Sequence, residues 1–168
     1  MSTLLSLCVL TISDSRTQAN DSSGDYLANA IHTDGHRLHA RAMVRDDKYQ
    51  IRALLSAWIA DSAVDGIICT GGTGFTGRDS TPEAVLPLLD KEMPGFGELF
   101  RHLSYGQIGT STMQSRALAG LANGAFVFCL PGSTGACELG WQEIIRHQLN
   151  SGTKPCNLVA LKGRLHER

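Results

Sequence analysis

Residues 65–83, which read DGIICTGGTGFTGRDSTPE, decide the fold of this chain. The stretch begins with a short apolar run at 67–69, typical of a buried strand, and continues into a loop rich in glycine. Thr81, Pro82 and Glu83 then supply a hydroxyl cap, a proline in the first turn and an acid near the positive end of a helix. The sequence therefore predicts a buried strand, a glycine-rich turn and a helix in succession.

This order brings exposed backbone N–H groups and a helix N-terminus together, which is a setting that binds anions such as phosphate. Asp79 lies in the same loop, and a carboxylate beside a phosphate indicates Mg²⁺ between them. Asp79 is equally suited to capping a turn or to pairing with Arg78. One glycine is enough for a tight turn, so the four at 71, 72, 74 and 77 favour a ligand close to the backbone over a purely structural connection.

Two nucleotide-binding motifs compete for the same loop. Residues 72–77 match the dinucleotide pattern G-x-G-x-x-G, but in that fold the helix begins within the glycines, whereas here the helix signal waits until Thr81. A Walker P-loop requires a Lys-Ser/Thr pair after the glycines, and this loop has none. Both motifs are therefore disfavoured.

Composition limits the remaining choices. A chain of 168 residues suits one domain, spanning 1–168, with one substantial core. A net charge of -1 without a basic tract argues against a nucleic-acid partner. No run reaches the ~18 apolar residues that span a membrane, and the apolar N-terminus resembles a first strand rather than a signal peptide. The five cysteines form no C-x-x-C pair, which indicates small buried thiols in a reducing cytoplasm rather than a zinc site.

The first half of the chain alternates strands and helices. Continuous apolar residues at 5–12 and partial alternation at 36–44 predict two strands, and a helix capped by Ser22 or Ser23 is expected between them. A clear amphipathic helix follows, because one apolar stripe recurs at helical spacing. Its members are Ile51, Leu54, Leu55, Trp58 and Ile59.

In the second half, the sequence predicts two helices, then a hairpin and then a third helix. Pro87 should shorten or kink the helix that starts at Thr81, and a further helix is expected at about 96–103. Asn-Gly at 123–124 separates two apolar runs and predicts a two-residue hairpin turn. Residues 131–134 form a second turn into a helix. An apolar patch at 158–161 is interpreted as an edge strand or a subunit contact.

Alternating strands and helices predict a three-layer α/β/α sandwich with a mostly parallel sheet and one antiparallel hairpin. The carboxyl ends of parallel strands share one edge, so the glycine loop and the turn at Pro131, Gly132 and Ser133 should lie together there. Two anion-binding turns suit a ligand with a phosphate and a ring system. Ser13 with Asp14, and Asp46 with Asp47, also follow predicted strands, and each pair is either part of this site or a solvated strand end. Asp46 and Asp47 are also candidates for a helix cap.

The motifs also resemble a known family, and the match runs in order from about residue 5 to residue 157. Together they are similar to the MoaB/MogA family of molybdenum cofactor biosynthesis proteins. They read TGGTG at 70–74, RDSTPEA at 78–84, MPGF at 93–96, SR at 115–116 and LPGS at 130–133, with IGTSTMQSR at 108–116 and KPCN at 154–157 pointing to the MoaB branch.

The resemblance implies a molybdopterin-binding fold, molybdopterin as substrate, and transfer of AMP from ATP to its phosphate with Mg²⁺. It assigns Thr73 and Asp79 to substrate and metal, Asp46 to the metal as the acid after the second strand, and Ser104 to catalysis. It also implies a cytoplasmic homotrimer or homohexamer, with other proteins of the pathway as possible partners. With the turns above, the predicted catalytic residues are Asp46, Asp79 and Ser104, and the predicted substrate-binding residues are Ser13, Gly71, Gly72, Thr73, Gly74, Arg116, Pro131, Gly132 and Ser133.

Three functions fit this pattern. The first is a molybdopterin adenylyltransferase, favoured because Arg78, Asp79 and Asp46 of the active pattern are present. The second is a non-catalytic molybdopterin-binding or carrier protein with the same pocket. The third is a different nucleotide-processing enzyme on the same fold, because a fold does not fix a function. Arg116 is either a buried structural base or a contact to substrate phosphate.

Overall fold

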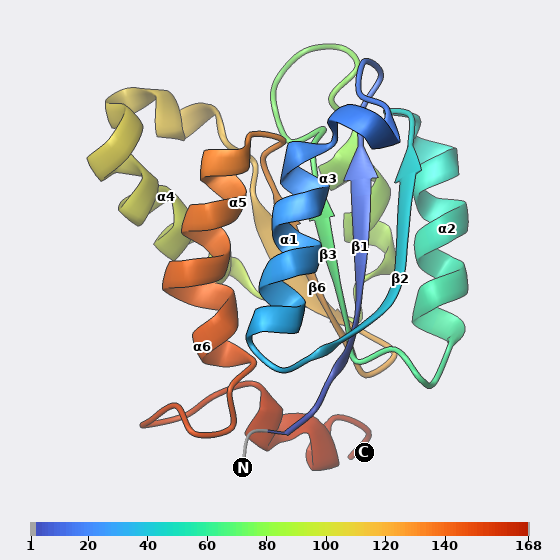
Figure 1. The fold of residues 1–168 in the computed structure, drawn as a ribbon, viewed down its shortest axis with the longest axis vertical. Helices are drawn as coiled ribbons and strands as arrows, with labels where there is room; N and C mark the ends of the chain where they lie inside the picture. Colours follow the sequence, from blue (N-terminus) through green and yellow to red (C-terminus); the bar gives the residue numbers. More distant parts are fainter. Residues whose placement is uncertain (1–2, 168) are drawn as a thin grey trace.

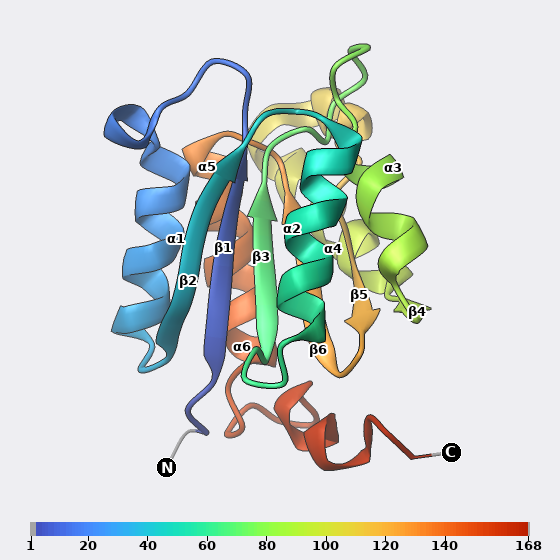
Figure 2. The same cartoon turned by 90° about the vertical axis from the view of Figure 1, so that its right-hand side faces the viewer.

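A computed structural model describes residues 3–167 as one mixed sheet between two layers of helices (Figures 1 and 2). The sheet has six strands in the order β2-β1-β3-β6-β5-β4. Their bounds are Ser6–Ile12 for β1, Arg37–Val44 for β2, Gly66–Thr70 for β3, Lys91–Glu92 for β4, Leu118–Ala122 for β5 and Ala125–Leu130 for β6. The predicted α/β sandwich is confirmed.

Strand direction fixes where the ligand-binding edge lies. Strands β1, β2, β3 and β6 are parallel, whereas β5 is antiparallel to β6 and β4 is antiparallel to β5. The four parallel strands therefore end at one edge of the sheet, and their loops meet there (Figure 2). The sequence did not predict β4, because a two-residue edge strand is too short to show a period.

The helices cover the sheet in two groups. They are α1 (Ser22–Thr33), α2 (Lys48–Ala60), α3 (Thr81–Val85), α4 (Pro94–Ile108), α5 (Thr134–Gly140) and α6 (Arg146–Gln148), with a π-helical turn at Trp141–Ile145 between the last two. Helices α1, α4 and α5 lie on one face of the sheet, and α2 and α3 lie on the other (Figure 1). The first group buries apolar side chains in one core cluster and the second group in another. Short 3-10 segments occupy Gln18–Asn20, Leu86–Leu88, Gly109–Gln114 and Val159–Arg164.

The local signals that predicted the hairpin and the short helix are confirmed. Asn123 and Gly124 both have positive φ, 48° and 81°, as the favoured hairpin turn requires. Helix α3 ends at Val85, and Pro87 lies in the 3-10 segment after it. The turn at 131–134 leads into α5, whose cap is Ser133, with its hydroxyl accepting from the backbone of Ala136.

Several predicted boundaries are wrong. Helix α1 is capped by Asp21, whose carboxylate accepts from Gly24 N, rather than by Ser22 or Ser23. Thr81 is the first residue of α3 and not its cap, because its hydroxyl donates to the carbonyl of Gly71. Helix α4 is longer than predicted at both ends. The apolar patch at 158–161 lies in and beside a 3-10 turn instead of an edge strand.

The cysteines follow the predicted pattern with one exception. Cys8, Cys69, Cys129 and Cys137 are buried, and burial raises the pKa of both Cys8 and Cys137 to about 11. Cys156 is exposed, which the sequence did not predict. Within residues 3–167, no group of three or more His, Cys, Asp or Glu side chains is placed to hold a metal ion.

Among residues 3–167, no helix combines the length and the apolar character needed to cross a bilayer.

Gly71 marks the closest approach between strand ends. Its φ is +109°, its N–H donates to Leu130 O at 3.0 Å, and a Cβ built on it would lie 2.0 Å from Ile12 O. A side chain at this position would therefore overlap the backbone at the end of β1, in addition to straining φ. The glycine holds the ends of β1, β3 and β6 together.

Gly71→Ala is expected to lower the free energy of unfolding by about 2 kcal/mol or more, because the overlap is with backbone and the conformation disfavours a side chain. Urea titration followed by circular dichroism measures this loss. Gly77→Ala is the matched control in the same loop, because no atom lies within 4 Å of its built Cβ. Equal stability of the two variants would contradict the packing described for Gly71.

Candidate functional site

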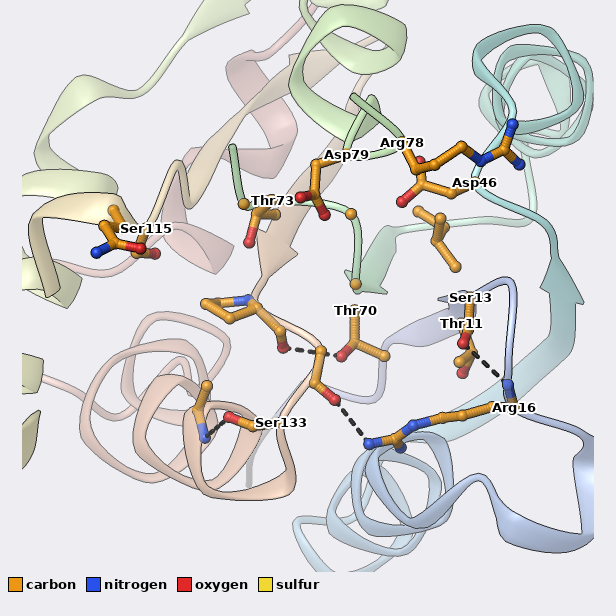
Figure 3. Close-up of a pocket in the computed structure, with 18 of the residues that line it drawn as sticks. Thr11, Ser13, Arg16, Asp46, Thr70, Thr73, Arg78, Asp79, Ser115 and Ser133 are labelled. Carbon is orange, nitrogen blue, oxygen red and sulfur yellow. Dashed lines mark hydrogen bonds between the residues drawn. The ribbon is translucent and has the colours of Figure 1, made fainter. Parts of the chain in front are cut away.

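A cleft of about 500 Å³ opens at the carboxyl edge of the parallel strands (Figure 3). The loops after β1, β2, β3 and β6 supply its floor and one wall, and α4 with the segment after it supplies the other wall. Eleven of the twelve predicted site residues line it. They are Ser13, Asp46, Gly71, Gly72, Thr73, Gly74, Asp79, Ser104, Pro131, Gly132 and Ser133.

The two glycine-bearing turns touch each other. A Cβ built on Gly132 would lie 3.3 Å from the Cα of Gly71. The hydroxyl of Thr70 donates to Pro131 O at 3.0 Å, which ties the end of β3 to the turn after β6 (Figure 3). Backbone groups of both turns are therefore available to one ligand.

Two glycines of the loop make room for carboxylates of the chain itself. A Cβ on Gly72, where φ is +65°, would lie 2.7 Å from Asp46 Oδ2, and a Cβ on Gly74 would lie 2.7 Å from Asp79 Oδ2. The number of glycines had indicated a ligand close to the backbone. At these two positions the approaching groups are Asp46 and Asp79, which the missing side chains allow to reach the cleft.

Asp46 is almost fully buried, and its environment disfavours its charge. The N–H and the hydroxyl of Ser80 donate to its Oδ1 at 3.1 and 2.9 Å. Burial raises the pKa of Asp46, and the nearby charges of Asp79 and Asp14 raise it further, against the hydrogen bonds from Ser80. Oδ2 of Asp46 therefore lies beside the glycine loop, where a bound cation would stabilise the ionised form of the carboxylate.

Asp79 both caps a turn and lines the cleft. Its Oδ2 accepts from the N–H and the hydroxyl of Thr76 at 2.8 and 2.7 Å. Burial by itself raises the pKa of Asp79, but hydrogen bonds from Thr76 and Gly74 and the charge of Arg116 bring it below its ordinary value. Asp79 is thus an ionised carboxylate at the rim at neutral pH. Among the predicted alternatives, pairing with Arg78 does not occur.

Arg78 instead pairs with Asp14 across the mouth of the cleft. Its Nε and Nη2 donate to the two oxygens of Asp14 at 2.8 and 2.9 Å, and both side chains are exposed. This hydrogen bond lowers the pKa of Asp14. Asp14 also accepts from the backbone of Asp46, so it joins the loop after β1 to those after β2 and β3. Asp47, by contrast, caps α2 by accepting from Tyr49 N and Gln50 N.

Sequence analysis did not predict Arg16 as a cleft residue, nor most of the wall that α4 and the segment after it supply. Arg16 lines the cleft and donates Nη2 to Gly132 O at 3.0 Å, which holds the turn after β6 (Figure 3). The wall from α4 and the 3-10 segment has no repeating pattern that would have marked it as a binding surface. Its cleft residues are Phe100, Ile108, Ser111, Gln114 and Ser115, beside the predicted Ser104.

Arg116 is the one predicted site residue that does not line the cleft. Its guanidinium donates Nε to Gly74 O at 2.8 Å and Nη2 to Asp79 O at 3.0 Å. It therefore contacts the glycine loop from outside the cleft, which corresponds to the structural alternative for this residue.

The cleft holds carboxylates of the kind that bind Mg²⁺. Magnesium is commonly bound by one or two carboxylates together with water and substrate phosphates. Asp46 and Asp79 both line the cleft, and each keeps one carboxylate oxygen outside the hydrogen bonds from Ser80 and Thr76. These two residues fit such an ion in the presence of a phosphate ligand.

Sequence comparisons identify related proteins for this chain. Residues 8–151 match the family model described as a probable molybdopterin binding domain. Molybdenum cofactor biosynthesis protein B of Escherichia coli strain K12 is 50% identical over 151 residues, which cover 90% of this chain and 89% of that protein. The protein of the same name from Staphylococcus carnosus strain TM300 is 47% identical over 146 residues, covering 84% and 85%.

Solved structures give the same answer. A crystal structure of molybdenum cofactor biosynthesis protein B superposes with a TM-score of 0.88 at 39% identity, covering 99% of this chain and 98% of that one. The tungsten cofactor synthesizing protein MoaB from Pyrococcus furiosus superposes with a TM-score of 0.76 at 36% identity, covering 84% and 91%. With the family model matching most of its length, the chain belongs to the MoaB family of molybdenum cofactor biosynthesis proteins.

Proposed function

We propose that this protein binds molybdopterin in the cleft and transfers AMP from ATP to the phosphate of the pterin, releasing pyrophosphate. The observation that carries the proposal is the placement of Asp46 and Asp79 in the same cleft as the two touching glycine turns. Membership of the MoaB family supports the pterin as ligand. Phosphate and carboxylates in one cleft are the setting of phosphoryl and nucleotidyl transfer.

In this reaction an oxygen of the pterin phosphate attacks the α-phosphorus of ATP. The new bond joins that oxygen to the α-phosphorus, the bond between the α-phosphorus and the bridging oxygen breaks, and pyrophosphate leaves with the electron pair. No covalent intermediate on the protein is needed. Asp46 and Asp79 would hold Mg²⁺, which supplies positive charge to the phosphate oxygens in the transition state.

Backbone and hydroxyl groups of the chain would position the reacting phosphates. The turns at 71–74 and 131–133 border the cleft with peptide groups whose orientation is fixed by the contacts around Gly71. Thr73 and Ser104 are buried residues that line the same cleft. Preorganised donors of this kind stabilise charge without reorganising during the reaction. Ser104 is accordingly proposed as a donor to a phosphate oxygen.

The direct test is an assay of pyrophosphate release from ATP with purified protein, molybdopterin and Mg²⁺. Release that depends on both the pterin and Mg²⁺ supports adenylyl transfer. Tight pterin binding in isothermal titration without any release would instead favour the non-catalytic carrier. Turnover of ATP without the pterin would favour a different nucleotide-processing enzyme.

Asp79→Asn is expected to lower Mg²⁺-dependent AMP transfer by about a hundredfold or more, because the variant loses charge at the proposed metal site. Pterin affinity, measured by titration, should stay close to that of the wild type. Asp47→Asn is the control, since Asp47 lies beside Asp46 in sequence but caps α2 and does not line the cleft. An Asp79→Asn variant with full activity would contradict the metal assignment.

The raised pKa of Asp46 gives a prediction about stability and pH. A carboxyl with a higher pKa in the folded state binds more protons when folded, so stability falls as pH rises from the ordinary Asp value through the raised one. Asp46→Asn removes this penalty and is expected to make the ligand-free protein at least as stable as the wild type at pH 7.

Urea unfolding at several pH values measures this difference, which should shrink as the pH falls through that window. The same variant should lose the stabilisation that Mg²⁺ with ATP gives the wild type. A variant less stable than the wild type at pH 7 would show that the charge of Asp46 is not disfavoured.

Assembly into a homotrimer or homohexamer is part of the proposal. Support comes from large apolar side chains that are exposed on α4 and the segment after it, namely Leu99, Tyr105, Ile108 and Met113. Light scattering coupled to size-exclusion chromatography determines the number of subunits.

A further inference from the structure

Arg116 contacts the glycine loop from outside the cleft with several donors at once. Its side chain is 25% exposed, and the residue itself stands in the short connection between the 3-10 segment that ends at Gln114 and strand β5. Two of its nitrogens donate to backbone carbonyls, those of Gly74 and Asp79, and its third, Nη1, pairs with the carboxylate of Glu83. One guanidinium thus uses Nε and both terminal nitrogens on a single stretch of chain.

These contacts fix both ends of the loop that carries Asp79. The carbonyls of Gly74 and Asp79 are five residues apart in sequence, yet both are hydrogen-bonded to one planar group. The backbone N–H of Arg116 adds a third bond, to Thr73 O at 3.0 Å. Phe75, in the same loop, has its ring centroid 5.3 Å from the guanidinium carbon. The span of the loop is therefore set by Arg116.

The same contacts orient peptide groups toward the cleft. In a planar trans peptide the C=O and the following N–H point in opposite directions. The carbonyl of Thr73 points to Arg116, so the N–H of Gly74 points away from it, toward Asp79, whose pKa it helps to lower. Arg116 thereby sets the position of the Asp79 carboxylate, because it holds the loop backbone on the side away from the cleft.

We propose that Arg116 is a positioning residue for the proposed metal site, holding residues 73–79 so that Asp79 reaches the cleft. This inference rests on the proposed function for its effect on activity, but not for its effect on the loop. Direct contact with substrate is the task of other groups, because Arg16 and Arg78 are the guanidiniums that line the cleft among the described residues.

The geometry of the guanidinium group makes the proposal specific to arginine. A guanidinium offers several donors in fixed directions, whereas a lysine carries the same charge as a single compact group. Arg116→Lys therefore keeps the charge while losing the simultaneous bonds to the two carbonyls. If charge alone mattered, lysine would replace arginine; if geometry matters, it will not.

The test compares Arg116→Lys and Arg116→Gln with Arg52→Gln. Arg52 is a matched control because its guanidinium also donates to two backbone carbonyls, those of Glu83 and Ala84, but holds α3 instead of the loop. Hydrogen exchange of amides in residues 73–80 is measured by mass spectrometry without any ligand. Both Arg116 variants should exchange about tenfold faster there, with Arg52→Gln close to wild type. Unchanged exchange in Arg116→Lys would overturn the proposal, whatever Arg116→Gln shows, because the lysine cannot make the two bonds at once.

Kinetics provide the second readout. Arg116→Lys should lower kcat for AMP transfer by about tenfold to a hundredfold, as misplacement of a catalytic group does, with little change in KM for the pterin. Combined with Asp79→Asn it should cause no further loss, because both act through one carboxylate. Additive losses, or a change confined to KM, would overturn the positioning role. If the wild type forms no pyrophosphate, the proposed function fails, and the exchange experiment still decides the role of Arg116.

Discussion

The close contact of backbone at Gly71 is the constraint on which the rest of the site depends. The residue directly follows β3, donates to the end of β6 and lies against the carbonyl that ends β1. Three strand ends can converge this closely only where a side chain is absent. The loops that follow these strands are therefore forced to share one opening, and the sheet edge becomes a cleft instead of a row of separate turns.

Around this contact, two carboxylates reach the cleft because the neighbouring loop residues have no side chains. Gly72 and Gly74 leave room for the carboxylates of Asp46 and Asp79, and hydrogen bonds from Ser80 and Thr76 hold those carboxylates in place. Arginines act on the same loops through carbonyl oxygens, as Arg16 does at Gly132. The acids and the peptide groups are therefore positioned by one hydrogen-bonded network before any ligand binds, which is the condition for electrostatic catalysis.

Much of this could be predicted from sequence because the signals were local. Asn123 with Gly124 specified the hairpin, Pro87 ended a helix, and strand ends predicted which loops would meet. Contacts between distant residues could not be predicted. Sequence alone gave no sign that Arg78 would choose Asp14, which is 64 positions away, over its neighbour Asp79.

Helix ends and the cleft wall formed by α4 were also difficult to predict, because both depend on contacts made only in the folded chain. Three adjacent residues, Asp21, Ser22 and Ser23, are all good helix caps, and only the fold shows which side chain faces the free N–H groups. The wall formed by α4 and residues 109–114 depends on how that helix packs against the sheet, which no periodicity in its own sequence reveals.

The pairing of Arg78 with Asp14 also affects how an anion would enter. Among the described residues, the charged side chains that line the cleft are three carboxylates and two guanidiniums, and both guanidiniums already have partners. Arg78 pairs with Asp14, and Arg16 donates to Gly132 O and lies 3.7 Å from Asp21. With the chain as a whole at a net charge of -1, long-range attraction does not steer a polyphosphate toward this opening. Binding of an anion would begin only at short range, at the amides of the turns. A nucleotide bound to a divalent ion would be repelled less by the cleft carboxylates than a nucleotide without one.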